Sequence, residues 1–309
     1  MLTVIFSSFN GEPTVQRMLE ACCNLAPPDG GWKLVAVDNG STDRTGDIMR
    51  AFGQRLPIEI LTVAARGKNR ALNVALDHVE GDLVVLTDDD VIPDAQWLRK
   101  LEECARDHPD HELFGGPILP HWPRPPDPWI LADVPLGVTF ALTDRTIKDG
   151  EVSSDTIWGP NMAIRKSVLD RGIRFNSNVG PDGTSDYMMG SETEFTRRLA
   201  RDGVKAWFCA DAQVSHMIRE HQLSVDWILQ RAHRHGRSAY FLDHKIDSSA
   251  PTVFGVERWL YTQLVSSGLR AIAYLLRGRK SEWFKAMRLH YYTRGGLAQA
   301  RAMRGRTGP

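Results

Sequence analysis

The stretch that best indicates the fold is LVVLTDDD, residues 83–90, in which an apolar strand runs directly into three carboxylates. Such charges at a strand end repel one another unless a cation joins them, and a hard divalent ion with oxygen ligands can then bridge two phosphates of a nucleotide. In an open parallel sheet, ligands bind at the carboxyl ends of the strands. Taken alone, the stretch is explained equally well as an acidic turn in which Asp90 or Asp94 caps the next helix.

A second stretch of the same kind lies upstream, where VAVDNGSTD at residues 35–43 delivers Asp38 and then turns into a helix. Asp38 could accept a hydrogen bond from a base or a ribose. The run that follows it is also good turn and cap chemistry by itself. Its position upstream of the acidic strand end, within the same pattern of strands and helices, makes a functional role for Asp38 more credible.

Short apolar runs alternate with segments of helical period through the first 120 residues, which is the pattern of an α/β fold with a mostly parallel sheet covered by helices. The expected strands are 2–7, 33–38, 58–63 and 83–87, and the expected helices are 13–25, 43–53, 68–78 and 94–107.

A proline-rich passage, PILPHWPRPPDP at residues 117–128, cannot continue regular structure and predicts a change to a second half. That half is expected to hold strands at 157–164 and 206–214, a loop at 176–191 and a helix at 192–202, with a helical period from residue 221 onward. The expected parts are a nucleotide-sugar-binding half, 1–120, an acceptor-binding and catalytic half, 121–240, and a basic helical extension, 241–309.

Composition indicates a globular protein and argues against several other classes. The chain has 309 residues, with 42% apolar and 25% charged, as in globular proteins, and its 38 basic and 38 acidic residues give no overall field that favours nucleic acid. Four cysteines without a CxxC pair argue against a zinc site and against a disulfide framework, and favour a reducing compartment. We expect no signal peptide and no membrane-spanning segment, because no uncharged apolar run is long enough.

Several runs in order resemble the inverting, family 2 type of GT-A glycosyltransferase, whose fold is a Rossmann-like, mostly parallel sheet covered by helices. The resemblance covers roughly residues 1 to 240. It rests on SSFN at 7–10, VDNGSTD at 37–43, GKNRALN at 67–73, the DxD of Asp88 and Asp90, GPNMA at 159–163, GSETE at 190–194 and VSH at 214–216.

The resemblance implies a nucleotide diphosphate sugar as donor and a divalent metal, Mn²⁺ or Mg²⁺, as cofactor. It implies that Phe9 and Asp38 lie against the base, with Asp38 accepting from N3 of uracil or thymine, and that Asp90 holds the metal. His216 corresponds to an accessory position that ligates metal in some members. The nucleotide-binding residues expected on this basis are Ser8, Phe9, Asp38, Lys68, Asp88 and Asp89.

Transfer of a sugar to a hydroxyl needs a group that accepts the hydroxyl proton, and the resemblance assigns this role to Glu192. The family usually shows Glu-Asp where this chain has Ser191 and Glu192, so Glu194 is a second candidate. On one helical turn the two differ by about 200° in direction, so only one can face the site. Trp158, Asn161 and Glu194 are expected near an acceptor or donor-sugar pocket, and Arg219 could touch phosphate.

The end of the chain differs in charge from the rest, because residues 255–309 hold eleven Lys and Arg against two acidic residues, a net charge of +9. An apolar stripe with a cationic face and Trp259, Trp283 and Phe284 beside it suits attachment to an anionic membrane surface. A helical hairpin packed on the rest of the protein or on another subunit explains it equally well. We expect the protein to be cytoplasmic. Peripheral attachment to the inner face of the cell membrane and assembly into an oligomer are both compatible with the sequence.

The sequence thus predicts transfer of a sugar, from a UDP-sugar in preference to a dTDP-sugar, to a saccharide or lipid-linked saccharide. One alternative is a noncatalytic sugar-nucleotide-binding or scaffold protein of a polysaccharide assembly complex. Another is a sugar-nucleotide pyrophosphorylase, which is disfavoured because the first strand is not followed by that class's phosphate loop.

Overall fold

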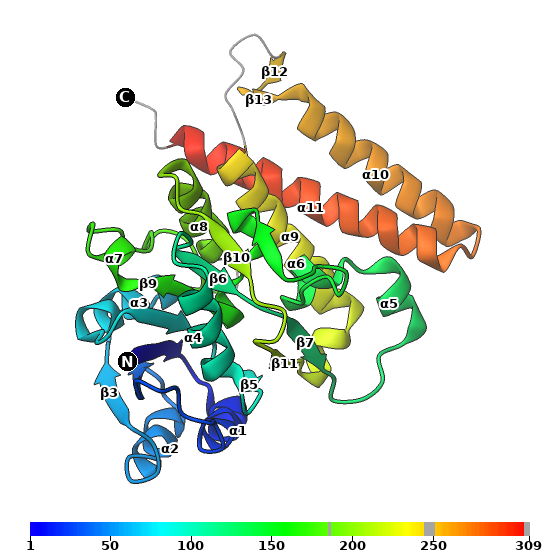
Figure 1. Cartoon of the computed structure of the whole chain (residues 1–309). Helices are drawn as coiled ribbons and strands as arrows, with labels where there is room; N and C mark the ends of the chain where they lie inside the picture. The colour runs from blue at the N-terminus through cyan, green and yellow to red at the C-terminus, as the bar shows by residue number, and fades with distance from the viewer. Residues whose placement is uncertain (185–186, 244–250, 306–309) are drawn as a thin grey trace. The chain divides into compact units, whose positions relative to one another are not determined.

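The computed structural model describes residues 1–184, 187–243 and 251–305 (Figure 1). Contacts group the chain into two compact units. The first unit comprises Met1–His121, Phe140–Ser185 and Ser191–Ile218, and the second comprises Trp122–Thr139, Asp186–Gly190 and Arg219–Pro309. The expected boundaries at residues 120 and 240 divide the chain by function and not by contacts, so this division stays a prediction. Its last part, and the 255–309 tail, include residues that lie outside those described.

The first unit is built on an eight-stranded sheet of order β3-β2-β1-β4-β9-β6-β10-β8. Strands β3, β2, β1 and β4 are parallel neighbours, whereas β9 runs antiparallel to both β4 and β6. The strands are β1 Leu2–Ser8, β2 Trp32–Asp38, β3 Ile58–Thr62, β4 Leu83–Leu86, β6 Leu113–Gly115, β8 Gly150–Val152, β9 Met162–Arg165 and β10 Ala206–Phe208. The predicted mostly parallel α/β sheet is confirmed.

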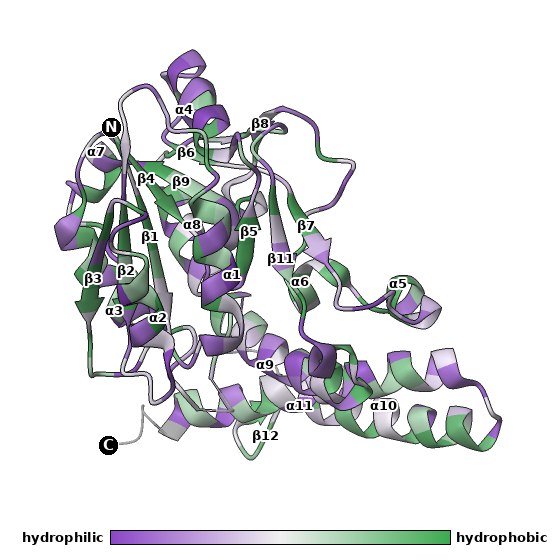
Figure 2. Ribbon diagram, turned by 90° about the horizontal axis from the view of Figure 1, so that it is seen from below, coloured by the Kyte–Doolittle hydropathy of each residue, from purple (hydrophilic) through white to green (hydrophobic). Residues whose placement is uncertain are grey.

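The parallel strands form the core because both of their faces are covered. Val4, Ile5 and Phe6 on β1 are fully buried, as are Val35 and Val37 on β2. A strand covered on both sides reads as a continuous apolar run, which is how these strands stand out in the sequence. Figure 2 shows the same strands in the colour of hydrophobic residues, with mixed colours on the helices around them.

Helices follow the strands of the first unit, close to where the sequence predicts them. They are α1 Glu12–Cys22, α2 Thr45–Ala51, α3 Lys68–Ala75, α4 Trp97–Asp107, α7 Lys166–Leu169 and α8 Ser191–Arg201, with α6 Leu136–Phe140 at a change of unit. Helix α3 begins directly after Gly67, whose φ of 135° is one that other residues avoid. The glycine therefore lets the chain turn sharply and place Lys68 at the first position of the helix.

Two predicted strands are wrong in their extent. The expected strand 157–164 is a 3₁₀ turn, Gly159–Asn161, followed by β9, because Pro160 cannot donate to a sheet ladder. The expected strand 206–214 is two strands in two sheets, β10 and β11 Val214–Met217. Strand β11 lies between β5 Val91–Pro93 and β7 Ile118–His121 in a separate three-stranded sheet. This break brings His216 beside the residues that follow the acidic strand end.

The expectation against a disulfide framework needs a correction, because one pair of cysteines is bonded. Cys104 on α4 and Cys209 after β10 are bonded, with 6.2 Å between their Cα atoms, although 105 residues separate them in the sequence. Cys22 and Cys23 are free thiols. Disulfides persist mainly in oxidising compartments, so the cysteines no longer support a reducing, cytoplasmic location.

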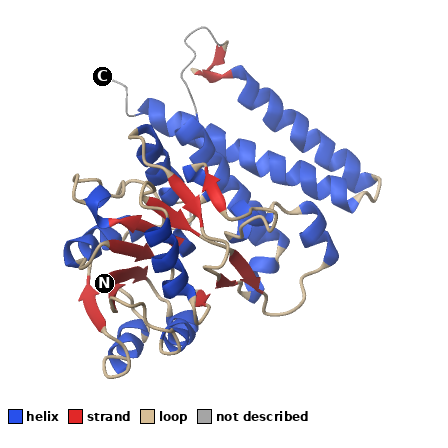
Figure 3. Ribbon diagram, viewed as in Figure 1, coloured by secondary structure: helices blue, strands red, loops and turns tan. Residues whose placement is uncertain are grey.

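The second unit is mostly helical, as Figure 3 shows. It contains α5 Pro128–Asp133, α9 Val225–Asp243, the strands β12 Thr252–Val253 and β13 Val256–Glu257, α10 Arg258–Leu276 and α11 Lys280–Gly305. Helix α11 lies between α9 and α10 (Figure 1). Within the described residues, no helix is both long enough and apolar enough to span a membrane.

Candidate active site

The first part of the site is the edge where β1, β2 and β4 end. Ser8 ends β1 and is paired in register with Asp38, which ends β2. Ser8 Oγ donates a hydrogen bond to Asp89 Oδ2 in the acidic run after β4. Gly11 packs against both, since a Cβ there would lie 2.1 Å from Ser8 Oγ and 2.2 Å from Asp89 Oδ2. Three separate strands therefore deliver their polar residues to one edge of the sheet.

The centre of the site is a cluster of three charged side chains from three elements. Lys68 Nζ at the start of α3 lies 2.6 Å from Asp88 Oδ1 and 2.7 Å from Glu192 Oε1 at the start of α8. The three side chains are mostly buried, with exposed fractions of 16% for Lys68 and 21% for each carboxylate. The structure thus joins three of the predicted site residues that are far apart in the sequence.

The electrostatics of this cluster keep the lysine and Glu192 ionised. Burial alone would lower the pKa of Lys68, but the charges of Asp88 and Glu192 outweigh it and raise that pKa. Burial alone would raise the pKa of Glu192, and the Lys68 charge lowers it instead. The pKa of Asp88 is raised, first by burial and then by the nearby charges of Asp90 and Glu192, against the opposing effect of Lys68.

The backbone around Glu192 leaves it little space. A Cβ on Gly159 would lie 2.5 Å from Glu192 Cγ. The same turn is tied to the acidic strand end, because Thr87 Oγ1 donates to the Pro160 carbonyl at 3.1 Å. The Gly159–Asn161 turn therefore packs directly behind the candidate base, a role of Gly159 that sequence reasoning did not find.

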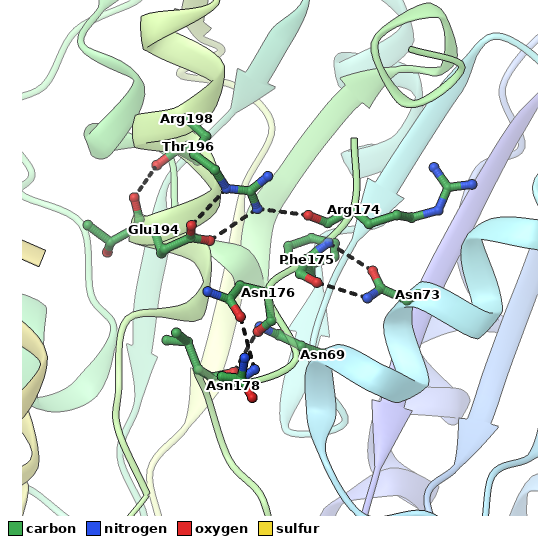
Figure 4. A network of polar contacts seen from close by, with 11 residues as sticks. Asn69, Asn73, Arg174, Phe175, Asn176, Asn178, Glu194, Thr196 and Arg198 are labelled. Atoms are coloured by element: carbon green, nitrogen blue, oxygen red, sulfur yellow. Dashed lines mark hydrogen bonds and ion pairs between the residues drawn. The ribbon is translucent and has the colours of Figure 1, made fainter. Parts of the chain in front are cut away.

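A network of asparagine amides ties α3, the helix that carries Lys68, to the segment around residues 175–179 (Figure 4). Asn69 on α3 donates to the carbonyls of Asn176 and Val179, at 2.8 and 2.9 Å. Asn73, one turn further on, exchanges two hydrogen bonds with the Phe175 backbone. Both asparagines belong to the GKNRALN run, which was assigned no such role from sequence.

Glu194 points away from the cluster. Its carboxylate pairs with Arg198 on the same helix, with 2.7 Å between Arg198 Nε and Glu194 Oε1, and Arg198 also donates to the Arg174 carbonyl (Figure 4). The inference that only one of the two glutamates faces the cluster holds in the structure, and the one that does is Glu192. Glu194 thus has a structural partner, and its contact with a sugar stays a prediction.

A pair of possible metal ligands lies next to the cluster. His216 Nε2 on β11 is 3.2 Å from Asp90 Oδ1, and both side chains are largely buried. His216 Nδ1 donates to the Phe140 carbonyl at 2.7 Å, which leaves Nε2 to face Asp90. Burial would lower the pKa of His216, but the charge of Asp90 outweighs it and raises that pKa.

This pair fits a cation that also binds phosphate. A histidine whose other ring nitrogen donates to a carbonyl is typical of metal ligands. In the part of the chain that the structure describes, no three His, Cys, Asp or Glu side chains group to hold a metal by themselves. Mg²⁺ needs only one or two protein ligands when substrate phosphates complete its coordination, so two ligands suffice for such a site.

The two residues expected near the base each have partners of their own. Asp38 Oδ1 accepts from the Ser41 backbone N–H at 2.9 Å, and a Cβ on Gly46 would lie 2.8 Å from its Oδ2. The Phe9 ring is covered by the guanidinium of Arg66, 4.8 Å from its centre. Arg66 was not found from sequence, because nothing in its neighbourhood marks a cation–π partner for a residue so far away.

The remaining expected site residues have different positions. Asn161 is buried, accepts from Trp97 Nε1 and donates to the carbonyls of Pro117 and Ala212. Its place beside a sugar pocket stays a prediction. Trp158 is only half-buried, and its ring nitrogen donates to the Asp155 carbonyl. Arg219 belongs to the second unit, and its contact with phosphate stays a prediction.

Known proteins share this fold. The crystal structure of a mannosyltransferase from Pyrobaculum calidifontis in complex with GDP-Man and Mn²⁺ matches with a TM-score of 0.58 and 18% identity, over 96% of this chain and 86% of that one. The structure of S. aureus TarS 1-349 in complex with UDP-GlcNAc matches with a TM-score of 0.57 and 15% identity, over 96% and 92% of the two chains. Both are GT-A glycosyltransferases, which confirms the predicted fold.

Two curated relatives come from Haloferax volcanii. Glycosyltransferase AglE is 30% identical over 226 residues, 71% of this chain and 67% of AglE. Glucosyl-dolichyl phosphate glucuronosyltransferase is 20% identical over 222 residues, 68% of this chain and 67% of the relative. The sequence model of glycosyl transferase family 2 matches residues 3–172, more than half of the chain. The chain therefore belongs to glycosyl transferase family 2, as its motifs and its fold together predict.

Proposed function

We propose that this glycosyltransferase moves a sugar from a nucleotide diphosphate donor to a hydroxyl of a saccharide or lipid-linked saccharide, with inversion at the anomeric carbon. The observation that carries the proposal is the cluster of Asp88, Lys68 and Glu192. Burying three charges is costly, and an apolar core of the same volume is often as stable or more so. Their retention at the carboxyl edge of a parallel sheet therefore favours a role in catalysis over one in stability.

In this proposal Glu192 accepts the proton of the acceptor hydroxyl as the oxygen attacks the anomeric carbon. The carboxylate is ionised because Lys68 lowers its pKa, so it is in the state that a general base needs. Asp88 binds near the ribose, and Asp38 and Phe9 bind the base. Asp90 and His216 would hold a divalent cation, which supplies positive charge to the leaving diphosphate.

The donor and the acceptor are proposed on different grounds. A UDP-sugar is favoured, and a dTDP-sugar is second, because Asp38 can accept from N3 of either base. A lipid-linked acceptor is supported by the name of one relative, a glucosyl-dolichyl phosphate glucuronosyltransferase. A noncatalytic scaffold or a pyrophosphorylase is not favoured, since the family to which the chain belongs transfers sugars.

The test compares two neighbouring glutamates. UDP-, dTDP- and GDP-sugars are first incubated with Mn²⁺ and a panel of lipid-linked saccharides, and acceptor-dependent release of nucleoside diphosphate identifies the pair used. On that pair, Glu192→Gln should lower the single-turnover rate by about 10²- to 10⁴-fold with little change in donor affinity. The matched control, Glu194→Gln, removes a carboxylate that pairs with Arg198 and should cost far less. Near-normal transfer by Glu192→Gln would refute the assignment.

A further inference from the structure

Helix α10 carries two apolar stripes with the same spacing. The first consists of Leu260, Leu264, Ser267 and Ala271, and it is buried or partly buried, with Leu260 in one core cluster with Leu297 of α11. The second consists of Val265, Leu269, Ile272 and Leu276, whose exposed fractions are 61%, 63%, 58% and 83%. A shift of five residues turns the stripe by about 140° around the helix. The second stripe, here called the outer stripe, therefore faces away from α11.

A second apolar feature stands directly before this helix. Phe254, at the tip of the β12–β13 hairpin, is 93% exposed. It has a φ of 47°, in the left-handed region that Gly and Asn favour and that a bulky residue rarely adopts. The base of the hairpin is held in place, since Val256 is buried and Tyr240 Oη donates to Glu257 Oε2 at 2.8 Å. An aromatic side chain is thus presented to solvent on a fixed support.

The charges around the outer stripe are mostly positive, with Glu257 and Glu282 at the two ends of the segment and Glu282 paired with Arg279. Residues 258–281 contain no acidic residue and five basic ones, Arg258, Arg270, Arg277, Arg279 and Lys280. Trp259, half-exposed at the start of the helix, adds an aromatic ring of the kind found at membrane interfaces. In Figure 2, the end of α10 and the turn after it show hydrophobic and hydrophilic colours next to each other.

We propose that the outer stripe and Phe254 dock on an anionic phospholipid surface. A row of exposed apolar side chains on one helix face favours an interaction site over isolated surface residues. A two-fold contact with a second copy would bring the same cationic surface against itself, whereas an anionic bilayer accepts both the apolar side chains and the cations beside them. This attachment goes beyond sugar transfer and does not depend on it.

The test uses the full chain and vesicles of phosphatidylglycerol and phosphatidylcholine, with vesicles of phosphatidylcholine alone for comparison. The protein should sediment with the anionic vesicles at low salt and be released at high salt, because exposed charges are screened. Leu269→Gln with Ile272→Gln should weaken this binding by about tenfold or more, as two large apolar side chains no longer enter the bilayer. Val74→Gln, at an exposed apolar residue of the first unit, is the control and should bind as the unchanged protein does.

Phe254→Asn separates docking from folding. Asn adopts the left-handed conformation more easily than Phe, so this variant should melt no lower than the unchanged protein and yet bind vesicles less tightly. Nucleotide affinity should be the same in all variants. The proposal is overturned if the unchanged protein stays in the supernatant with anionic vesicles at low salt, or if the Leu269 and Ile272 double variant still sediments fully. It is also overturned if light scattering shows that this double variant converts a dimer to a monomer, which makes a second copy the occupant.

Discussion

Lys68 lies between two carboxylates that would repel each other without it. Asp88 is presented by a strand end and Glu192 by a helix start, and the ammonium group lies within 2.7 Å of both. Because all three side chains are mostly buried, water screens their interaction less than it would at the surface. The lysine therefore controls the ionisation of the candidate base in the protein without ligands.

The charge of Lys68 should set the acid limb of the pH–rate profile. It lowers the pKa of Glu192, so Lys68→Gln should raise that pKa. A base works only when deprotonated, and activity is lost as the pH falls through its pKa, so the acid limb of single-turnover transfer should move to higher pH in the variant.

A matched lysine elsewhere in the sheet gives the control. Lys33 on β2 also lies between two carboxylates, 2.8 Å from Glu59 and 2.6 Å from Glu80. Lys33→Gln should leave the acid limb where it is. If the limb of Lys68→Gln coincides with that of the unchanged enzyme, the pairing of Lys68 with Glu192 does not persist in the working complex.

Most charged residues of the candidate site could be predicted from the sequence, and the small ones could not. Asp88, Asp90 and Glu192 stand out because they lie in runs that match the family's motifs in order. Gly11 and Gly159 do not stand out, because the neighbours that exclude a side chain there are distant in the sequence. Asp89 comes 78 residues after Gly11, and Glu192 comes 33 residues after Gly159. Such close approaches depend on the tertiary fold.

At the scale of elements, α9 and α11 pack closely enough to exclude side chains at two glycines. A Cβ on Gly295 of α11 would lie 1.9 Å from the His233 carbonyl oxygen, and one on Gly236 of α9 would lie 1.8 Å from the Tyr292 carbonyl oxygen. Both obstacles are backbone atoms, which cannot move aside without shifting a helix. The two glycines therefore fix the distance between the helices.

Gly295→Ala should destabilise the second unit by about 1 to 3 kcal/mol, as overpacking does, even though Ala is the better helix former. The neighbouring Gly296→Ala is the control, because its Cβ would make an ordinary 3.4 Å contact with Leu260 Cδ2. That change should be neutral or stabilising by up to about 1 kcal/mol. The test compares the midpoints of urea unfolding of the two variants. Equal midpoints would contradict the close packing of α9 on α11.

The disulfide between α4 and the segment after β10 should stabilise the first unit. It closes a loop of 105 residues, and removing a cross-link typically costs about 2 to 4 kcal/mol. Cys104→Ala with Cys209→Ala should lower the melting temperature. Reductant should lower the melting temperature of the unchanged protein and leave that of the double variant as it is. Cys22 is a poor reporter of reduction, since burial, with a smaller effect of Cys23, raises the pKa of its thiol to about 12. A melting temperature insensitive to reductant would show that the bond does not form.

Element prediction succeeded where the chain repeats one pattern and failed where it changes sheet. Parallel strands β1 to β4 alternate with helices, so a buried apolar run followed by a helical period is enough to place them. The segment 206–214 reads as one strand because its turn contains Cys209 and Ala212, both buried. The disulfide and the pairing of β11 with β5 and β7 divide it, and neither can be read from the segment itself.

At the scale of the whole molecule, a nearly neutral chain is divided into regions of opposite charge. Residues 255–309 carry +9, so the rest of the chain carries −9. All the residues proposed to bind the nucleotide and the cation, from Ser8 to His216, lie in the first unit. Ligand binding and attachment to a surface can therefore be changed independently, by substitutions in different units.

Bound ligands should stabilise the first unit against heat. UDP at 100 times its dissociation constant should stabilise the folded state by about 2.7 kcal/mol, because it binds only that state. For a unit of this size, the melting temperature should rise by about 5 to 10 °C. If Asp90 and His216 hold the cation against the diphosphate, the shift with Mn²⁺ should exceed the shift with chelator. Asp90→Asn should remove this difference, whereas the exposed Asp110→Asn should retain it. Equal shifts with and without Mn²⁺ in the unchanged protein would count against a metal at Asp90, and a metal-dependent shift that survives in Asp90→Asn would move the cation to another residue of the acidic run.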